Sequence, residues 1–243
     1  MSEQANQPLG EVAFTHDWYR RFLRRLQADG YEFRPFSAPL ADGDVVLRHD
    51  VDLSIDRAVE MARIEAEMGI ESTYFVLLTS SLYNPFEADC RDAINEIASL
   101  GHDVALHFST HLYWTDDDSP TASAIERHVR QERAILETIV PIADAVSFHR
   151  PPSWVLDRSF DGFESAYAPT FFSEIGYVAD STQRWREEPP QMDELPETMQ
   201  LLTHPGLWAE ADADFEGRLE EATVAACAHA ERNAREEFGG ADV

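Results

Sequence analysis

The sequence contains no lysine: all 19 of its basic residues are arginine, against 46 acidic residues, and the formal net charge is −27. So few positive charges argue against nucleic acid and anionic lipid as partners, because both are bound by neutralising phosphate. Self-repulsion among carboxylates is screened at high ionic strength, so this composition is typical of proteins that work in concentrated salt. We therefore expect a halophilic host and interpret the charge as an adaptation to the solvent.

Cysteines and long apolar runs are also scarce. Cys90 and Cys227 are too few for a disulfide scaffold and lack the spacing of metal ligands, so we expect two free thiols. Residues 1–10 carry no basic segment followed by an apolar core, which argues against a signal peptide. No apolar run approaches the roughly 18 to 20 residues that span a bilayer. The sequence therefore predicts a cytoplasmic protein without membrane insertion.

What the chain does contain is an alternation of short apolar runs and helical patterns. The runs predict strands near 45–49, 73–78, 104–106, 145–148, 176–179 and 199–203. The helical patterns fall near 14–28, 55–68, 86–100, 122–140 and 211–238. Strands that are apolar throughout and alternate with helices predict a buried parallel sheet in a single α/β domain.

Polar side chains recur where the predicted strands end. These side chains are Asp50, Asp52, His107, His111, His149, Arg150, Asp180 and His204. The carboxyl ends of parallel strands meet at one rim, and active sites of α/β proteins assemble there. We therefore expect a hydrolytic site at this rim.

Three of these residues form a candidate metal-ligand set. His107 and His111 are four residues apart, a spacing that places two imidazoles on one face of a helical turn, and Asp52 would add a carboxylate. Two histidines and one carboxylate leave coordination positions open, as a catalytic zinc requires. We predict a divalent metal, with Zn²⁺ the first choice and Co²⁺, Ni²⁺ and Fe²⁺ as alternatives.

The remaining rim residues suggest acid–base roles. Asp50 lies two residues before Asp52, faces the same way on a strand and could accept a proton from attacking water. His204 could protonate the leaving group, and Arg150 with Asp180 could orient Asp50 and keep it ionised. Each residue also has an ordinary alternative. Asp50 and Asp52 could cap the following helix, His204 could serve a turn, and Arg150 could pin a loop.

Taken in order, these segments resemble the polysaccharide deacetylase family, the NodB-homology fold of carbohydrate esterase family 4. Arg48-His49-Asp50-Val51-Asp52 resembles an Asp-x-Asp variant of the first family motif, and His107-Phe108-Ser109-Thr110-His111 resembles the second. Arg150-Pro151-Pro152-Ser153-Trp154 resembles the third motif, and Asp180 with Trp185 the fourth. Leu201-Leu202-Thr203-His204 matches the fifth.

The resemblance implies a distorted (β/α)7 barrel, a divalent metal and hydrolysis of N-acetyl groups on a carbohydrate substrate. On this basis we expect residues 1–43 to form an N-terminal helix and loop, 44–208 the catalytic barrel and 209–243 an acidic C-terminal helix. Trp154 and Trp208 could stack on a sugar ring, although burial in the core is an equal alternative for both. The Asp-x-Asp form of the first motif leaves the division of base and ligand between Asp50 and Asp52 open.

Two other functions remain compatible with these residues. One is hydrolysis of another C–N bond, in a cyclic amide or formamide, on the same fold. The other is a non-catalytic relative that binds glycan. A zinc peptidase of the His-Glu-x-x-His type is disfavoured because no glutamate lies between His107 and His111. The sequence makes no prediction of the oligomeric state.

Overall fold

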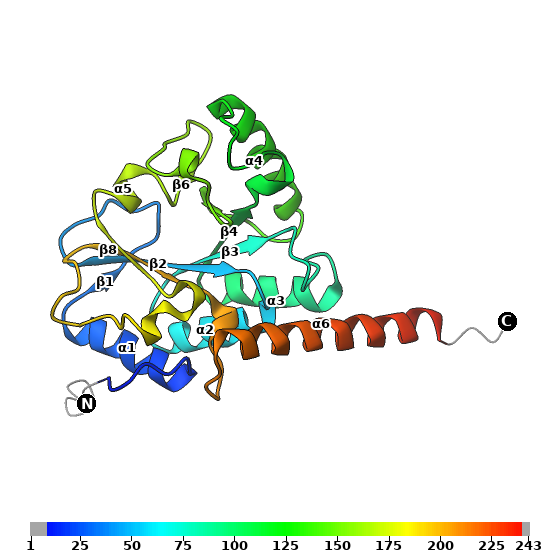
Figure 1. The fold of residues 1–243 in the computed structure, drawn as a ribbon, viewed down its shortest axis with the longest axis horizontal. Helices are drawn as coiled ribbons and strands as arrows, with labels where there is room; N and C mark the ends of the chain where they lie inside the picture. Colours follow the sequence, from blue (N-terminus) through cyan, green and yellow to red (C-terminus); the bar gives the residue numbers. More distant parts are fainter. Residues whose placement is uncertain (1–8, 240–243) are drawn as a thin grey trace.

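In the computed structural model, which describes residues 9–239, eight parallel strands form one curved sheet (Figure 1). The strand order is β6-β5-β4-β3-β2-β8-β7, and β1 pairs with β2 beside this path. The strands are β1 (Glu32–Phe33), β2 (Asp44–Val51), β3 (Thr73–Leu77), β4 (Asp103–Phe108), β5 (Ala145–Phe148), β6 (Glu164–Ser165), β7 (Gly176–Ala179) and β8 (Met199–Thr203). This half-barrel confirms the predicted distorted (β/α)7 architecture.

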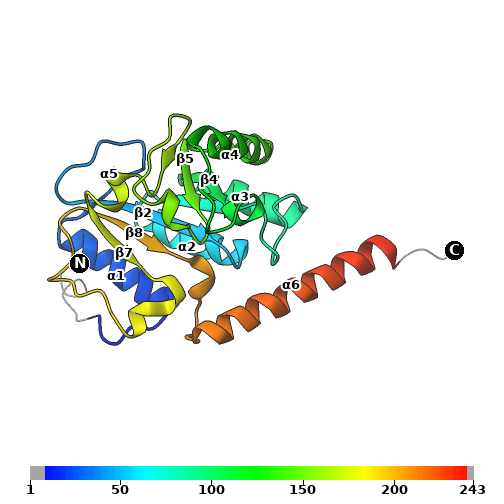
Figure 2. The same cartoon turned by 45° about the horizontal axis from the view of Figure 1, so that its top comes forward.

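Helices alternate with the strands and cover the outside of the sheet (Figure 2). The α-helices are α1 (His16–Ala28), α2 (Ile55–Glu67), α3 (Ala88–Ser99), α4 (Ala122–Leu136), α5 (Pro169–Phe172) and α6 (Phe215–Phe238). The short 3₁₀ helices are η1 (Thr110–Leu112), η2 (Ser153–Val155), η3 (Ser181–Arg186) and η4 (Pro205–Leu207). None of the described helices is both long and apolar enough to span a bilayer.

The central strand β2 is buried along its whole length, and its two faces serve different purposes. His49 points to the helical side, where its ring contacts Glu65 on α2 at 3.0 Å and Thr203 at 2.8 Å. Arg48 and Asp50 occupy the opposite face, because successive side chains of a strand alternate. That inner face also carries Val46, which joins an apolar cluster inside the half-barrel. Strand β2 therefore delivers a buried ion pair to the inside of the barrel.

The half-barrel has an open seam between its edge strands β6 and β7. No backbone hydrogen bond joins these two strands in the described part of the chain, and they lie at opposite ends of the sheet order. Aromatic side chains pack across the seam instead: Tyr167 follows β6, Tyr177 lies on β7, and Phe172 ends α5 between them. Aromatic side chains therefore fill the space between the two edge strands.

Helix α6 projects beyond the body of the domain (Figure 1). Its base is fixed by Arg218, which is buried and donates hydrogen bonds to the carbonyls of Leu207 and Phe14. Further along, His229 and Asn233 contact Glu87 at the start of α3. The N-terminal helix α1 packs into the same apolar cluster as strand β2. The expected division of the chain at residues 44 and 208 therefore stays a prediction.

Candidate metal centre

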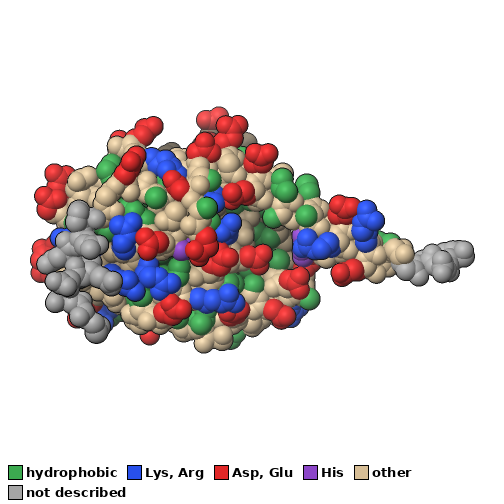
Figure 3. Space-filling view, turned by 90° about the horizontal axis from the view of Figure 1, so that it is seen from below, with side chains coloured by type: hydrophobic (Ala, Val, Ile, Leu, Met, Phe, Trp, Pro, Cys, Tyr) green, Lys and Arg blue, Asp and Glu red, His purple; other side chains and the backbone are tan. Residues whose placement is uncertain are grey.

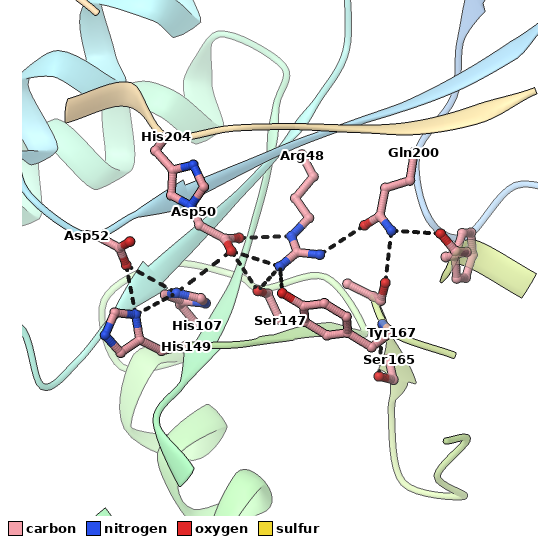
Figure 4. Close-up of polar contacts among 12 residues, drawn as sticks. Arg48, Asp50, Asp52, His107, Ser147, His149, Ser165, Tyr167, Gln200 and His204 are labelled. Carbon is pink, nitrogen blue, oxygen red and sulfur yellow. Dashed lines mark hydrogen bonds and ion pairs between the residues drawn. The ribbon is translucent and has the colours of Figure 1, made fainter. Parts of the chain in front are cut away.

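Three potential metal ligands meet at the carboxyl rim, each delivered by a different strand (Figure 4). Asp52 directly follows β2, His107 lies near the end of β4, and His149 directly follows β5. The strands are buried apolar runs, so they fix the backbone from which these polar side chains extend. The site is therefore held by the sheet rather than by long loops.

The three donor atoms form a nearly equilateral triangle. Asp52 Oδ1 lies 3.1 Å from His107 Nε2 and 3.1 Å from His149 Nδ1, and the two ring nitrogens are 3.2 Å apart. Metal–ligand bonds of about 2.0–2.2 Å place neighbouring donors roughly 2.8 to 3.1 Å apart in octahedral geometry and roughly 3.3 to 3.6 Å apart in tetrahedral geometry. Asp52 Oδ1 is buried and has no hydrogen bond of acceptable geometry. The triangle therefore fits one divalent cation.

The charge state of Asp52 also suits a metal ligand. Burial favours its neutral form, but contacts with the imidazoles of His107 and His149 outweigh this and hold the pKa of Asp52 far below its ordinary value. Asp52 is therefore a carboxylate at neutral pH.

His111, which we expected to be the third ligand, is not brought to this triangle. Its Nε2 lies 3.0 Å from the carbonyl oxygen of Arg150, and its Nδ1 lies 3.7 Å from a carboxylate oxygen of Asp116. The expectation assumed that both histidines share a helical turn, but His107 is on strand β4 and His111 is on η1. The change from strand to 3₁₀ helix turns the imidazole of His111 away from Asp52 and His107. The third potential ligand near these two residues is His149.

Asp50 lies beside the triangle and is paired with Arg48. The guanidinium donates to both carboxylate oxygens, from Nε at 2.9 Å and from Nη2 at 2.7 Å, and both side chains are buried. Ser147 Oγ donates a further hydrogen bond to Asp50 at 3.1 Å. Burial opposes ionisation of Asp50, but the attraction of Arg48 and of His107 outweighs it and lowers its pKa. Asp50 is therefore an oriented carboxylate, 3.8 Å from His107 Nε2.

Arg150 and Asp180, which we expected to orient Asp50, are placed otherwise. Arg150 is exposed, with a backbone φ of 46° that turns the chain away after β5. Asp180 is fully buried, and its carboxylate accepts hydrogen bonds from the ring and the backbone N–H of His204 and from Trp208 Nε1. Arg48, two residues before the carboxylate it binds, does what Arg150 was expected to do.

His204 faces Asp50 and Asp52 from the end of β8 (Figure 4). Its Nδ1 lies 2.6 Å from Asp180 Oδ1. Burial lowers the pKa of His204, but the attraction of Asp180, Asp52 and Asp50 is stronger and raises the pKa to about 9. The ring is therefore an imidazolium at neutral pH and can donate a proton.

Neither tryptophan expected to bind sugar lies in the site. Trp208 is fully buried among aromatic residues of the N-terminal helix and donates its indole N–H to Asp180. Its ring therefore belongs to the core and supports the partner of His204. Trp154 is half-buried against Trp114 and does not line the cavity beside the metal centre.

A cavity of about 540 Å³ opens beside these groups. Its polar lining residues are Asp50, Asp52, His107, His149, Arg150, Ser181, Thr182 and His204. Its remaining wall is mostly apolar, with Leu53, Phe148, Leu156, Tyr167, Phe172, Tyr177, Leu202, Leu207 and Phe215 among the lining residues. Asp50, His204 and the donor triangle thus all face one space of substrate size.

Arg48 and His149 are the two residues whose roles sequence reasoning missed. His149 carried the right signal, because it directly follows a buried strand as Asp52 does, but the His-x-x-x-His spacing took precedence. Arg48 lies inside an apolar run that predicts a buried strand, and a buried arginine is almost always paired with an acidic residue. Asp50, two residues later on the same face of that strand, is that partner.

No family model matches the sequence, and no curated protein matches it. Solved structures of carbohydrate esterase family 4 (CE4) do resemble the fold. A CE4 pseudoenzyme from Bacillus anthracis is 13% identical with a TM-score of 0.44, over 76% of this chain and 60% of that chain. A peptidoglycan deacetylase from Bacillus subtilis is 13% identical with a TM-score of 0.43, over 80% of this chain and 96% of that chain.

A family 4 acetyl xylan esterase from Clostridium thermocellum, in complex with a cobalt ion, is 12% identical with a TM-score of 0.43. The match covers 78% of this chain and 84% of the esterase. The present chain spans about three fifths of the length of the pseudoenzyme. These solved structures are from the family that the sequence motifs resemble, and the likeness concerns the fold.

Proposed function

We propose that this protein is a metal-dependent hydrolase that removes N-acetyl groups from a carbohydrate. The observation that carries the proposal is the triangle of Asp52, His107 and His149 beside the Arg48-bound carboxylate of Asp50. The resemblance of five sequence segments to the deacetylase motifs supports the choice of an N-acetylated sugar. We also propose Zn²⁺ as the native metal, because two imidazoles and one carboxylate suit it.

Asp52, His107 and His149 would hold the metal, which when bound supplies a Lewis acid and an acidified water. Asp50 accepts a proton as the water oxygen bonds to the amide carbon. Arg48 keeps Asp50 oriented toward the cavity. His204 donates its proton to the amide nitrogen as the C–N bond breaks, and Asp180 holds the ring for that transfer. The products are the free amine and acetic acid, which ionises to acetate, and the proton held by Asp50 is returned to His204 before the next turnover.

The proposal is tested by metal analysis of the purified protein together with acetate release from a panel of N-acetylhexosamines in concentrated KCl. We expect about one metal per chain and acetate release that stops when the metal is chelated. Stoichiometric metal with no acetate release from any sugar, but with ring opening of cyclic amides or formate release from formamides, would assign the site to another C–N bond. A chain with neither metal nor activity would be a non-catalytic relative.

Two variants test the proposed acid, His204, and the proposed base, Asp50. His204→Ala should keep the metal and lower kcat by about 10²–10⁴-fold, because the leaving amine loses its proton donor. Asp50→Asn should also keep the metal and lower kcat by at least as much. Normal turnover in His204→Ala would refute the role of this residue, whatever the substrate.

A further inference from the structure

The cavity beside the metal centre is lined by both polar and apolar side chains. Apart from the ionisable residues around the donor triangle and Ser181 with Thr182, its lining side chains are mostly aromatic or aliphatic. Tyr167, Phe172 and Tyr177 are three aromatic members of this lining that pack together, and we call them the aromatic trio. A group placed against these three rings would meet mostly carbon.

The aromatic trio is a packed unit. Tyr167 and Phe172 meet edge to face with ring centroids 5.5 Å apart, and Phe172 meets Tyr177 in the same way at 5.1 Å. Tyr167 is held further by Arg48, which donates to its hydroxyl at 2.8 Å and lies 4.6 Å from the ring centroid. Its hydroxyl thus already accepts a hydrogen bond, and the residue lines the cavity.

The same guanidinium that holds the trio also holds Asp50 (Figure 4). Arg48 thereby fixes the distance between the base and the trio. The donor triangle and the trio line the same cavity, so a substrate whose amide lies at the triangle can extend toward the trio. At about 540 Å³ the cavity is much larger than an acetamido group needs and lies in the range of small-molecule pockets.

We propose that this site prefers amides that carry an apolar group of several carbons, which fills the space against the aromatic trio. This inference rests on the proposed amide hydrolysis and specifies the substrate class. The apolar group could be attached on the acyl side, as a chain longer than acetyl, or on the amine side, as an apolar aglycone of the sugar. Both sources share the same chemistry, and the experiment separates them.

The experiment compares three ligands on the metal-loaded protein: N-acetylglucosamine, N-hexanoylglucosamine and octyl N-acetylglucosaminide. Dissociation constants are measured by calorimetry, and kcat/KM is measured for every compound that turns over. Each buried methylene raises affinity roughly fourfold, so burial of two should give more than tenfold. We expect at least a tenfold gain for the hexanoyl compound or for the octyl compound, and the compound that gains identifies the side.

Phe172→Ala tests the location of the preference. Removing this ring should reduce the gain in affinity of the preferred compound over N-acetylglucosamine at least fivefold. The matched control is Phe33→Ala, at a half-buried phenylalanine of β1 that does not line the cavity, and it should leave the gain within twofold. If Phe172→Ala does not fold, Phe172→Leu should give an intermediate gain.

Equal or weaker binding of both apolar compounds by the wild-type protein would overturn this inference. That result would leave the proposed function intact if acetate were still released from N-acetylglucosamine. Conversely, a tenfold gain in binding without hydrolysis of any compound would support the apolar preference and refute the hydrolase. The two failures are therefore distinguishable.

Discussion

Arg48 is fully buried, and among residues 9–239 its one carboxylate partner is Asp50. Removing one member of a buried ion pair leaves the other charge without compensation and costs about 3–5 kcal/mol. Arg48→Met should therefore lower the free energy of unfolding by about that amount, measured by urea titration followed by circular dichroism.

The double variant Arg48→Met with Asp50→Asn is the control for this prediction. It removes both charges and should recover most of the loss, because neither partner is then left buried and ionised. A single variant that costs less than about 1 kcal/mol would show that Asp50 has other compensation for its charge.

His149 and His111 provide a second test at the scale of single residues. His149→Ala removes one corner of the donor triangle and should weaken binding of Zn²⁺ at least about 100-fold, measured by competition with a chromophoric chelator. His111→Ala should change it less than about threefold, because that ring contacts the carbonyl of Arg150 and no ligand. The reverse ranking would restore the His-x-x-x-His ligand pair and contradict the triangle.

At the scale of elements, helix α4 carries a buried carboxyl group outside the site. Glu132 packs beneath the loop after η1 and accepts a hydrogen bond from Tyr113 at 2.9 Å. Burial raises the pKa of Glu132 to about 7, and the hydrogen bond from Tyr113 only partly opposes the shift. The folded protein therefore holds this proton more tightly than the unfolded chain does.

This shift predicts how stability depends on pH. Wild-type stability should fall from about pH 4.5 to about pH 7 through Glu132, by at most about 3 kcal/mol, and level off above that. Glu132→Gln should match the wild type at pH 4 and exceed it by about 2 kcal/mol at pH 8, measured by urea unfolding at each pH. Glu137→Gln, at an exposed position that ends the same helix, is the control and should show no such difference. Parallel pH profiles for wild type and Glu132→Gln would contradict the assignment.

The elements most accessible to sequence reasoning were the central strands. Strand β3 and strand β4 are continuous apolar runs because both of their faces are buried, and such runs are visible without a structure. Strand β6 was missed because Glu164–Ser165 is too short to show any pattern. The apolar pattern thus predicted most of the sheet, including its edge strand β7, but not the two-residue strands β1 and β6.

The candidate site was predicted only as far as strand ends determine it. Asp52 and His107 could be placed because each extends from the carboxyl end of a buried strand. The choice of His149 over His111 depends on a backbone turn after Phe108, and the partner of Asp50 depends on side-chain packing inside the barrel. The sequence carried a signal for both, since His149 directly follows a buried strand and Arg48 lies two residues from Asp50, but the choice between these partners and the expected ones required the structure.

For the whole molecule, the dominant feature is its negative charge. Acidic side chains are spread over the surface between arginines, as one face shows (Figure 3). With a net charge of −27, repulsion among carboxylates destabilises the compact state until salt screens it. The expected salt-rich cytoplasm of the host remains a prediction from this charge.

Screening should be measurable directly. Raising KCl from 0.1 M to 2 M should raise the melting temperature by at least about 5 °C, or about 2 kcal/mol for a domain of this size. Choline chloride at equal ionic strength should act similarly, whereas sucrose at equal osmolality should do less. A larger effect of sucrose than of KCl would indicate that exclusion of solute, and not charge, is responsible.

Between β6 and β7 the half-barrel lacks the backbone hydrogen bonds that join its other neighbouring strands in the described residues. Elsewhere around the sheet, neighbouring strands are tied by backbone hydrogen bonds, so widening the ring there would break a ladder. At the seam, the ring contacts of Tyr167, Phe172 and Tyr177 are joined by Gln200 of β8, whose side-chain amide donates to the carbonyls of Ala166 and Phe171. Side chains thus take the place of a ladder here, while β2, β4 and β5, which carry or precede the donor residues, are joined through β3 by continuous backbone hydrogen bonds.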